Sequence, residues 1–587
     1  MLLGPVFSVE MVTSSRRTRY FAVRALYGSV LLLAFWMVYE SHFGYYTART
    51  TDIASVANFT AAFFNAFAVL QLLAIALLGP AMAAGTIATE RERRTIEYLF
   101  VANLSNLEIV FGKLAARLLQ IVSLVLVGLP ILALAMLLGG IAPEALVVAF
   151  LITVSTVLAV ATLSIAVSVW SARAREAVTR AYLVLLALFL VPPILSMLQY
   201  QAGAIYDKLL APINEHLLAS NPFWILQSVL SGASASGYSP AWQTVGILLR
   251  NHLMLSVGAL VAATIAVRPV HLHQTGLAPK RRRRLMHLLR PKPDNHPMLW
   301  KEIFAEPAAS RLGLVGRIAL AAIVLGVLGP TLYMFVTTVG NYGLNDTESF
   351  QTCSLIMGSV VGCGALLLIA ARAAGAVTSE KERACWDSLI STPLSPHQIV
   401  LAKILGNIYA LRGAMVILLL IWGMGVIVDT AFLKVVPFLL GTLLIVALFA
   451  GSLGVMFSLW CKSSLRSMGL TLVVGVFFGG AYLFCCVPVI FLEGGEELFL
   501  APCVPFLLAF PGVLYMEGAR ILEYDPELVA AYVLGNLAYL VTALLLYGGS
   551  VGNFDSLTGR TGRYAFHPDG PPRSPEIMVA EVVDTDE

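Results

Sequence analysis

The chain has 587 residues, of which 58% are hydrophobic and only 12% are charged, against roughly 25% charged residues in soluble domains. So few charges cannot cover the surface of a water-soluble globule of this length, and a soluble fold is excluded. Seven cysteines in the whole chain are too few for a disulfide-stapled scaffold. The composition therefore predicts a protein that lies mostly in lipid.

Apolar stretches of about twenty residues, the length that crosses a hydrocarbon layer of roughly 30 Å as a helix, recur along the chain. In the first half they lie near 21–39, 61–82, 114–138, 145–169, 178–199 and 244–267. In the second half they lie near 314–337, 353–374, 405–428, 434–459, 467–491 and 528–548. We therefore expect an all-α polytopic membrane protein with about twelve transmembrane helices.

The orientation follows from the basic residues, because cytoplasmic loops retain positive charge. With the N-terminus inside, only five of the 38 basic residues lie on or near the outer side, namely Arg49, Lys208, Arg250, Lys434 and Arg520. No small-residue cleavage site follows the first apolar run, so this run is expected to stay in the membrane. The prediction is an integral protein of the bacterial inner (cytoplasmic) membrane with both termini in the cytoplasm.

An internal repeat appears when the sequence is shifted by 290 positions. Ten identities then occur within residues 85–113 without a gap: Gly85, Glu90, Glu92, Arg93, Leu99, Leu104, Ser105, Ile109, Val110 and Lys113 meet their counterparts from Gly375 to Lys403. Each copy contains six predicted spans, and an even number returns the second copy to the same orientation. The repeat predicts two parallel six-helix units related by a pseudo-twofold axis along the membrane normal.

The repeat divides the chain into four parts. Residues 1–267 form the first six-span unit and residues 297–550 the second. Between them, residues 268–296 are a basic cytoplasmic linker with the run 280–284, for which we expect contact with anionic headgroups or simple solvation rather than nucleic-acid binding. Residues 551–587 are a polar, proline-rich cytoplasmic tail. The composition of the linker and the tail favours disorder.

The duplicated cytoplasmic segment predicts a helix, a tight turn and a second helix. A charged start precedes an apolar i, i+3, i+4 set in both copies, Ile96, Leu99 and Phe100 in the first and Trp386, Leu389 and Ile390 in the second. This spacing indicates one helical face, which can lie in the headgroup plane. A capping box follows in each copy, Ser105 with Glu108 and Ser395 with Gln398. A lone loop of this kind could simply mark the water boundary, but two at matched spacing favour a binding role.

These motifs resemble the membrane subunit of type-2 ABC transporters, most of which are exporters. The family's first cytoplasmic loop resembles Gly85, Ile87, Glu90, Glu92, Thr95, Glu97, Leu99, Leu104-Ser105 and Gly112-Lys113, and in the second copy Gly375, Glu380, Glu382, Asp387, Leu389, Thr392-Pro393-Leu394-Ser395 and Lys403. The family's N-terminal interfacial helix is resembled by Pro5 to Glu10 and by Pro297 to Glu302. Asn103, Cys385 and Ala402 depart from the pattern.

The resemblance implies two coupling helices that dock on ABC ATPase subunits, in two copies, with ATP and Mg²⁺ bound by those subunits and no cofactor in this chain. It implies that the coupling residues are Glu90, Glu92, Arg93, Glu380, Glu382 and Arg383, and that Glu10 and Glu302 belong to the interfacial helices. The segments after Asn221 and over 498–516 resemble the family's outer re-entrant helices. The expected function is that of an exporter permease for an unknown substrate that is hydrophobic or amphiphilic.

No catalytic or metal site is predicted in the chain itself. The Gly112-Lys113 pair is followed by Leu114 rather than Ser or Thr, so it does not form a phosphate-binding loop. His271 and His273 lack matched ligands for a metal, and whether Cys485, Cys486 or Cys503 form a disulfide stays open. Intramembrane carboxylates are lacking, which disfavours an ion-coupled carrier. The alternatives that remain are a non-transporting scaffold or regulator with a permease fold and a secondary transporter with parallel repeats.

Overall fold

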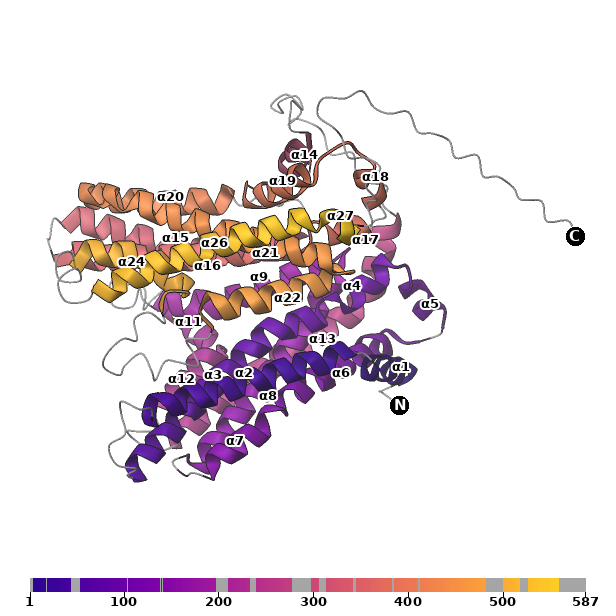
Figure 1. Ribbon diagram of the computed structural model, residues 1–587. Coiled ribbons are helices and arrows are strands. Elements are labelled where there is room, and N and C mark those ends of the chain that lie inside the picture. The colour runs from indigo at the N-terminus through magenta and orange to yellow at the C-terminus, as the bar shows by residue number, and fades with distance from the viewer. Residues whose placement is uncertain are drawn as a thin grey trace, which may run out of the picture.

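The computed structural model describes residues 4–16, 18–43, 53–102, 104–137, 139, 141–196, 210–232, 239–276, 297–305, 313–341, 345–382, 385–409, 412–481, 500–517 and 526–558. Every regular element within these ranges is a helix. The long helices run side by side in one bundle (Figure 1). The predicted all-α membrane class is confirmed.

Both halves consist of long helices joined by short ones. The first half contains α1 (Gly4–Ser15), α2 (Thr18–Phe43), α3 (Ile53–Ala83), α4 (Gly85–Glu92), α5 (Ile96–Val101), α6 (Asn106–Val125), α7 (Gly128–Met136), α8 (Pro143–Val169), α9 (Ala174–Ser196), α11 (Ala211–Leu218), α12 (Pro222–Gly232) and α13 (Ser239–Gly276). The second half contains α14 (Pro297–Trp300), the π-helix η3 (Lys301–Ala305), α15 (Gly313–Asn341), α16 (Asn345–Ala374), α17 (Thr378–Glu382), α18 (Trp386–Ile390), α19 (Pro396–Tyr409), α20 (Arg412–Val428), the 3₁₀ helix η5 (Thr430–Lys434), α21 (Val436–Trp460), α22 (Ser464–Val476), the π-helix η6 (Phe477–Ala481), α24 (Val504–Glu517), α26 (Pro526–Gly552) and α27 (Phe554–Thr558).

The described residues contain ten helices or helix pairs that are long and apolar enough to cross a membrane. An eleventh span arises if α19 and α20, which meet at a bend of 48°, are counted as one. The predicted stretch 467–491 begins as α22 and η6, and its remainder lies outside the described residues. The predicted spans are therefore recovered, apart from the part of this stretch that the structure does not describe.

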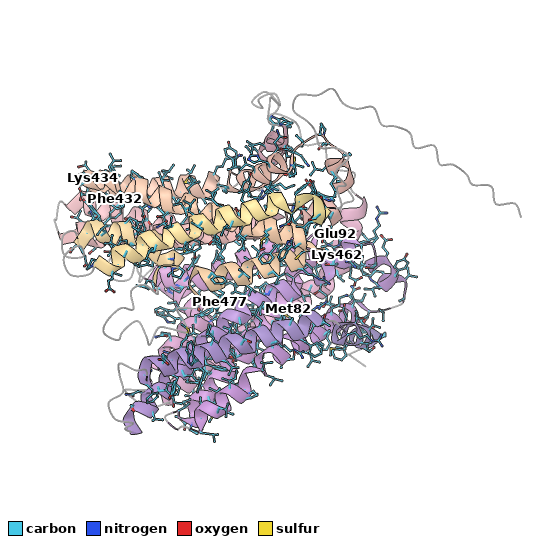
Figure 2. All side chains as sticks on the ribbon, in the orientation of Figure 1. Met82, Glu92, Phe432, Lys434, Lys462 and Phe477 are labelled. Carbon is cyan, nitrogen blue, oxygen red and sulfur yellow. The ribbon has the colours of Figure 1, made fainter. Side chains whose placement is uncertain are left out.

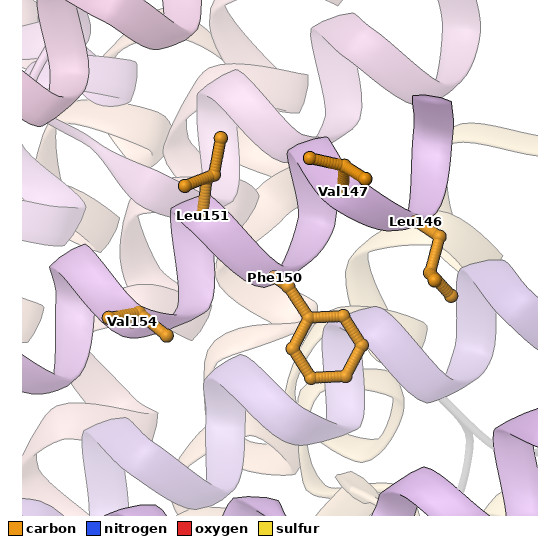
Figure 3. Close-up of a pocket in the computed structure, with 5 residues that line it drawn as sticks. All are labelled: Leu146, Val147, Phe150, Leu151 and Val154. Atoms are coloured by element: carbon orange, nitrogen blue, oxygen red, sulfur yellow. The ribbon is translucent and has the colours of Figure 1, made fainter. Parts of the chain in front are cut away.

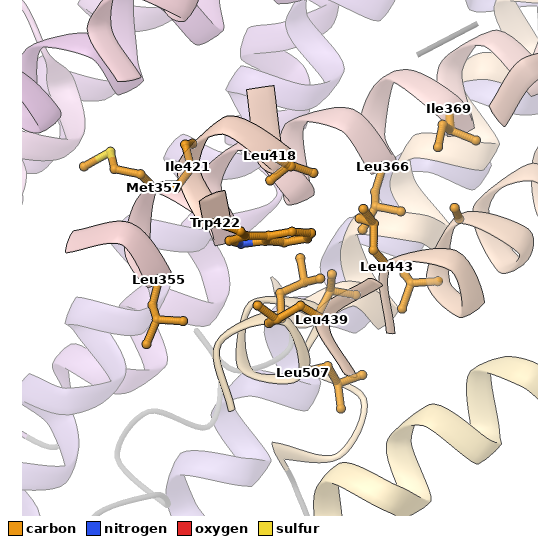
Figure 4. Close-up of a cluster of buried hydrophobic side chains, with 14 of the residues drawn as sticks. Leu355, Met357, Leu366, Ile369, Leu418, Ile421, Trp422, Leu439, Leu443 and Leu507 are labelled. Carbon is orange, nitrogen blue, oxygen red and sulfur yellow. The ribbon is translucent and has the colours of Figure 1, made fainter. Parts of the chain in front are cut away.

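Each half is built around one central helix. In the first half this is α8, whose 27 residues extend roughly 40 Å at 1.5 Å per residue; it packs along α13, α3 and α6. In the second half α21 holds the same place and packs along α26 and α16. Figure 4 shows part of the second core, where the Trp422 ring lies among Leu366, Leu418 and Leu439. The two central helices fix the position of the loops that follow α3 and α16.

The two halves meet through a reciprocal contact in which a glycine of each half faces a long side chain of the other. A Cβ atom added at Gly85 would lie 2.8 Å from a methyl carbon of Leu465, and one added at Gly375 would lie 2.7 Å from Cδ of Arg175. Positions 85 and 175 become 375 and 465 under the same shift of 290, so each half presents the same patch to the other. Such reciprocity is the mark of a twofold, isologous interface, and it agrees with two fused parallel units.

The two duplicated loops lie at the same end of the bundle. Figure 1 shows α4 and α5 at the same end as α17 and α18. Glu92 and Lys462 lie at this end, whereas Phe432 and Lys434 lie at the other (Figure 2). The repeats are therefore parallel, as the even number of spans in each predicts.

The first residues of the expected linker and of the expected tail are helical rather than disordered. Helix α13 continues through the start of the expected linker to Gly276, because Arg268 and His271 pack on the loop helix α5: the His271 ring lies 5.4 Å from the Phe100 ring. The start of the expected tail forms α27, in which Phe554 is fully buried and packs against Trp386. The rest of the linker and tail, 277–296 and 559–587, lies outside the described residues.

Candidate functional site

The first duplicated loop is held by a buried lysine. Lys113 on α6 is 3% exposed, and its ammonium lies 3.0 Å from Oε1 of Glu10 on α1 and 3.1 Å from Oε1 of Glu90 on α4. Arg117, one turn further along α6, reaches the other carboxylate oxygen of Glu10 at 3.2 Å. One lysine therefore ties the N-terminal helix and the loop helix to the third membrane span.

The second loop repeats this arrangement. Lys403 on α19 is 1% exposed, and its ammonium lies 3.2 Å from Oε1 of Glu302 and 3.1 Å from Oε1 of Glu380. It also donates to the carbonyl oxygen of Ala376 at 3.0 Å. Lys301 reaches Glu380 at 2.9 Å from the solvent side. The two ion-pair triads, Lys113 with Glu10 and Glu90 and Lys403 with Glu302 and Glu380, are called the lysine triads below.

Burial makes each lysine triad more rigid than a surface ion pair. The carboxylates of Glu302 and Glu380 are 14% exposed, so little water screens them. Removing one partner of such a pair leaves an uncompensated charge and costs about 3–5 kcal/mol, whereas exposed pairs contribute roughly 0–1 kcal/mol. The lysine triads therefore fix the geometry of the loops rather than offer free charges on the surface.

Glu92 and Glu382 cap the fifth span of each half. Glu382 accepts from the Ser464 backbone N–H at 2.8 Å and from its hydroxyl at 2.7 Å. Glu92 accepts from the Ala174 N–H at 3.3 Å. Ala174 and Ser464 begin α9 and α22, where backbone N–H groups lack helical partners and a carboxylate is favoured by the helix dipole. Each capping glutamate thus couples the loop to the span that packs at the interface between halves.

The start of each loop helix is fixed by a serine from the central helix. The Ser168 hydroxyl accepts from the N–H groups of Ile87 and Ala88 at 3.2 and 3.0 Å. The Ser458 hydroxyl accepts from Val377 and Thr378, both at 2.9 Å. A basic side chain closes the other side: Arg91 and Lys381 each donate to carbonyl oxygens at the end of the central helix, and burial lowers the pKa of Lys381 below its usual value.

The apolar faces of the loop helices point into the protein. Ile96 is buried against α6 and α8, and Trp386 and Leu389 lie in the corresponding cluster of the second half. The spacing thus predicts one helical face correctly, but this face packs on the neighbouring helices instead of lying in the headgroup plane. Both capping boxes form: the hydroxyls of Ser105 and Ser395 accept from the N–H groups of Glu108 and Gln398.

The outward side of the first loop carries both apolar and charged groups. Tyr98 is 76% and Val101 85% exposed, although both are large apolar residues. Glu92, Arg93 and Glu97 are exposed beside them. We call the exposed side chains of residues 93–101 the α5 surface. In the second loop Ser388, Ser391 and Pro393 are exposed, while Arg383 lies outside the described residues.

Sequence reasoning named Glu10, Glu90, Glu302 and Glu380 but missed the lysines that bring them together. Lys113 and Lys403 were visible as repeat identities on apolar helices, where a basic residue needs a partner. That pattern was the signal for the lysine triads. His271 lies on Phe100 and within 3.9 Å of Glu97, which gives it a packing role. Cys485 and Cys486 lie outside the described residues, and Cys503 is a buried free thiol.

The fold and the paired loops define a helical membrane permease made of two fused parallel units. Residues 6–267 and 331–549 match the model of the ABC-2 family transporter protein, and the chain belongs to this family. No curated protein and no solved structure matches it. Membership implies a transport role and association with ABC ATPase subunits. The chain is therefore the transmembrane component of a transporter.

Proposed function

We propose that this chain is the permease of an ABC exporter that moves a hydrophobic or amphiphilic substrate, driven by ATP hydrolysis on two separate ATPase subunits. ATP and Mg²⁺ bind those subunits, and none of the proposed chemistry is located in this chain. Both termini and both loops face the cytoplasm of a bacterial inner membrane. The single observation that carries the proposal is the pair of matched loops at one end of the bundle, each held by a buried lysine triad.

The loops have the construction that a force-transmitting contact needs. A partner that pushes on α5 meets a loop whose preceding helix, α4, is tied through Glu90 and Lys113 to the third span and through Glu92 to the fifth. Small motions are transmitted by packed, hydrogen-bonded elements of this kind because they move as rigid bodies. Glu90, Glu380 and the capping glutamates therefore act behind the contact. The α5 surface, with Arg93 at its edge, supplies the contact itself.

The α5 surface also has the composition of an interaction site. Exposed large apolar residues beside charges mark protein interfaces, and Tyr98 and Val101 lie beyond the loop's own packing. The second contact centres on α18, where Trp386 and Leu389 are buried and serines face outward. The two contacts are therefore alike in position but different in chemistry.

The test is to purify the chain with its ABC ATPase in nanodiscs and compare the double variant Tyr98→Ala, Val101→Asp with a control at the opposite end, Leu433→Asp. We expect the double variant to lose the ATPase from the complex and the control to retain it. Leu433 is 60% exposed, and Tyr98 and Val101 are also exposed. Neither variant therefore disturbs the packed core.

Equal ATPase retention and equal ATP turnover in both variants contradict the proposal. Inverted vesicles energised by ATP or by an ion gradient test the alternatives: substrate movement driven only by the gradient indicates a secondary transporter. Absence of movement and of stimulated ATPase activity under either condition indicates a scaffold.

A further inference from the structure

A cavity of about 310 Å³ lies within the first half, away from the duplicated loops. Helices α8, α9 and α13 and the C-terminal end of α11 form its wall. Its volume is about twice that of the ~150 Å³ apolar cavity that binds benzene, and it falls at the small end of ligand pockets, roughly 300–1,000 Å³. The cavity can therefore hold part of a molecule with several carbon atoms.

The lining is divided by polarity. Most of it is aliphatic or aromatic, including Ala159, Leu185 and Phe189. Its polar residues are Thr156 and a group joined by hydrogen bonds, Ser220, Asn251 and His252. None of the lining residues is Asp, Glu, Lys or Arg. By contrast, a depression on α8 lined by Leu146, Val147, Phe150, Leu151 and Val154 is wholly apolar (Figure 3). Of the two, only the divided cavity has groups that can orient a ligand.

Two helices, α8 and α13, and the turn that follows α11 build the polar end. His252 is 3% exposed; its Nε2 donates to the Ser220 carbonyl oxygen at 3.0 Å, and its Nδ1 lies 3.1 Å from the Ser155 hydroxyl. Asn251 Nδ2 donates to the Ser220 hydroxyl at 3.0 Å. An amide nitrogen carries two hydrogens, so Asn251 has a second one for the oxygen of a ligand.

In the second half, aromatic side chains fill the region that corresponds to this cavity. The position equivalent to Ala159 under the shift of 290 is Phe449, whose ring is buried and lies 4.9 Å from the Tyr539 ring. Tyr539 donates to the Pro502 carbonyl oxygen at 2.7 Å, a link from the last span to the outer segment like that of His252 to Ser220. The second half therefore keeps the link and fills the region with aromatic rings.

We propose that the cavity of the first half binds an amphiphile with an uncharged hydroxyl or carbonyl head, the head at the side-chain amide of Asn251 and the chain between Ala159, Leu185 and Phe189. A cationic head does not fit, because no Asp or Glu lines the cavity to offset its desolvation. The inference goes beyond the proposed function, since binding requires neither the ATPase nor transport.

The experiment uses the full chain in detergent, without ATPase, and a diazirine-tagged decanol as the photoreactive probe. Peptide mapping is expected to place the label on α8 and α13, and untagged decanol is expected to compete at least tenfold better than decylammonium. Ala159→Phe copies the second half and should reduce labelling at least fivefold. Phe449→Ala serves as the matched variant and should leave labelling of α8 unchanged.

A second variant controls for loss of labelling through misfolding. Asn251→Leu leaves the cavity open but removes the head contact, so decanol and decane should compete equally in it while the melting temperature stays within a few degrees of the parent. Unchanged labelling in Ala159→Phe, or equal competition by decanol and decylammonium in the parent chain, overturns the proposal.

Such a head could belong to a bilayer lipid or to a transported amphiphile. Repeating the labelling in phosphatidylcholine nanodiscs separates the two sources. Loss of α8 labelling in the nanodiscs, with labelling in detergent intact, assigns the cavity to the ester region of a lipid. Retained labelling assigns it to another amphiphile.

Discussion

Replacement of Lys403 by Met tests the lysine triads most directly. Methionine retains the length and apolar stem of the side chain but leaves Glu302 without its ammonium partner and Glu380 with only Lys301. Breaking a buried pair costs about 3–5 kcal/mol. We expect the low end, about 3 kcal/mol, because the carboxylates keep 14% of their exposure. At 1.4 kcal/mol per decade this is more than about 100-fold in the unfolding equilibrium.

The assay is unfolding of the purified chain in mixed micelles with increasing SDS, followed by far-UV circular dichroism. Lys462→Met is the matched control, an exposed lysine at the same end of the bundle (Figure 2), and we expect it to stay within about 0.5 kcal/mol of the parent. A second readout is the maleimide labelling rate of Met298→Cys, a buried position of α14, which should rise in the Lys403→Met background. Equal unfolding free energies for the two lysine variants would refute the reasoning.

Three further predictions concern other contacts. Glu382→Gln, which weakens the charged cap of α22, should lower the unfolding free energy by about 0.5–2 kcal/mol in the same assay; no change would mean that the cap is dispensable. Gly454→Ala should strongly lower the melting temperature, because the new Cβ would lie 2.8 Å from a backbone nitrogen, whereas Gly364→Ala, with open space around it, should raise it slightly. The hydrogen bond from Tyr515 lowers the pKa of the Asp429 carboxyl group. The stabilisation that the ionised Asp429 gives the folded state is therefore present above the unfolded pKa, about 3.9. It is lost as the pH falls through the lower pKa of the folded state. The stability difference between the parent and Asp429→Asn should then shrink below about pH 4, and a difference independent of pH would contradict this assignment.

The spans, the repeat and the capping boxes could be predicted from the sequence because each depends on local spacing. A capping box needs only a serine and a glutamate or glutamine three residues apart, and Ser105 and Ser395 form theirs as expected. The internal repeat predicted that matched residues lie at matched positions, and the lysine triads and capping glutamates obey it.

The roles of the charged residues could not be predicted because they depend on partners far along the chain. Glu90 was expected at a partner-binding surface, but it is drawn inward by Lys113, 23 positions away in sequence and on another helix. The extension of α13 into the expected linker depends on Phe100, which lies more than 160 positions earlier in the sequence. The composition of the linker alone does not indicate the contact with Phe100.

The reciprocal contact at Gly85 and Gly375 has a consequence for genetics. In a transporter assembled from two identical chains, any substitution at such a site alters both sides at once. Here the residue that faces each glycine is encoded separately, and the two have already diverged, Leu465 on one side and Arg175 on the other. A single codon change therefore perturbs one of the two glycine contacts and leaves the other as an internal reference.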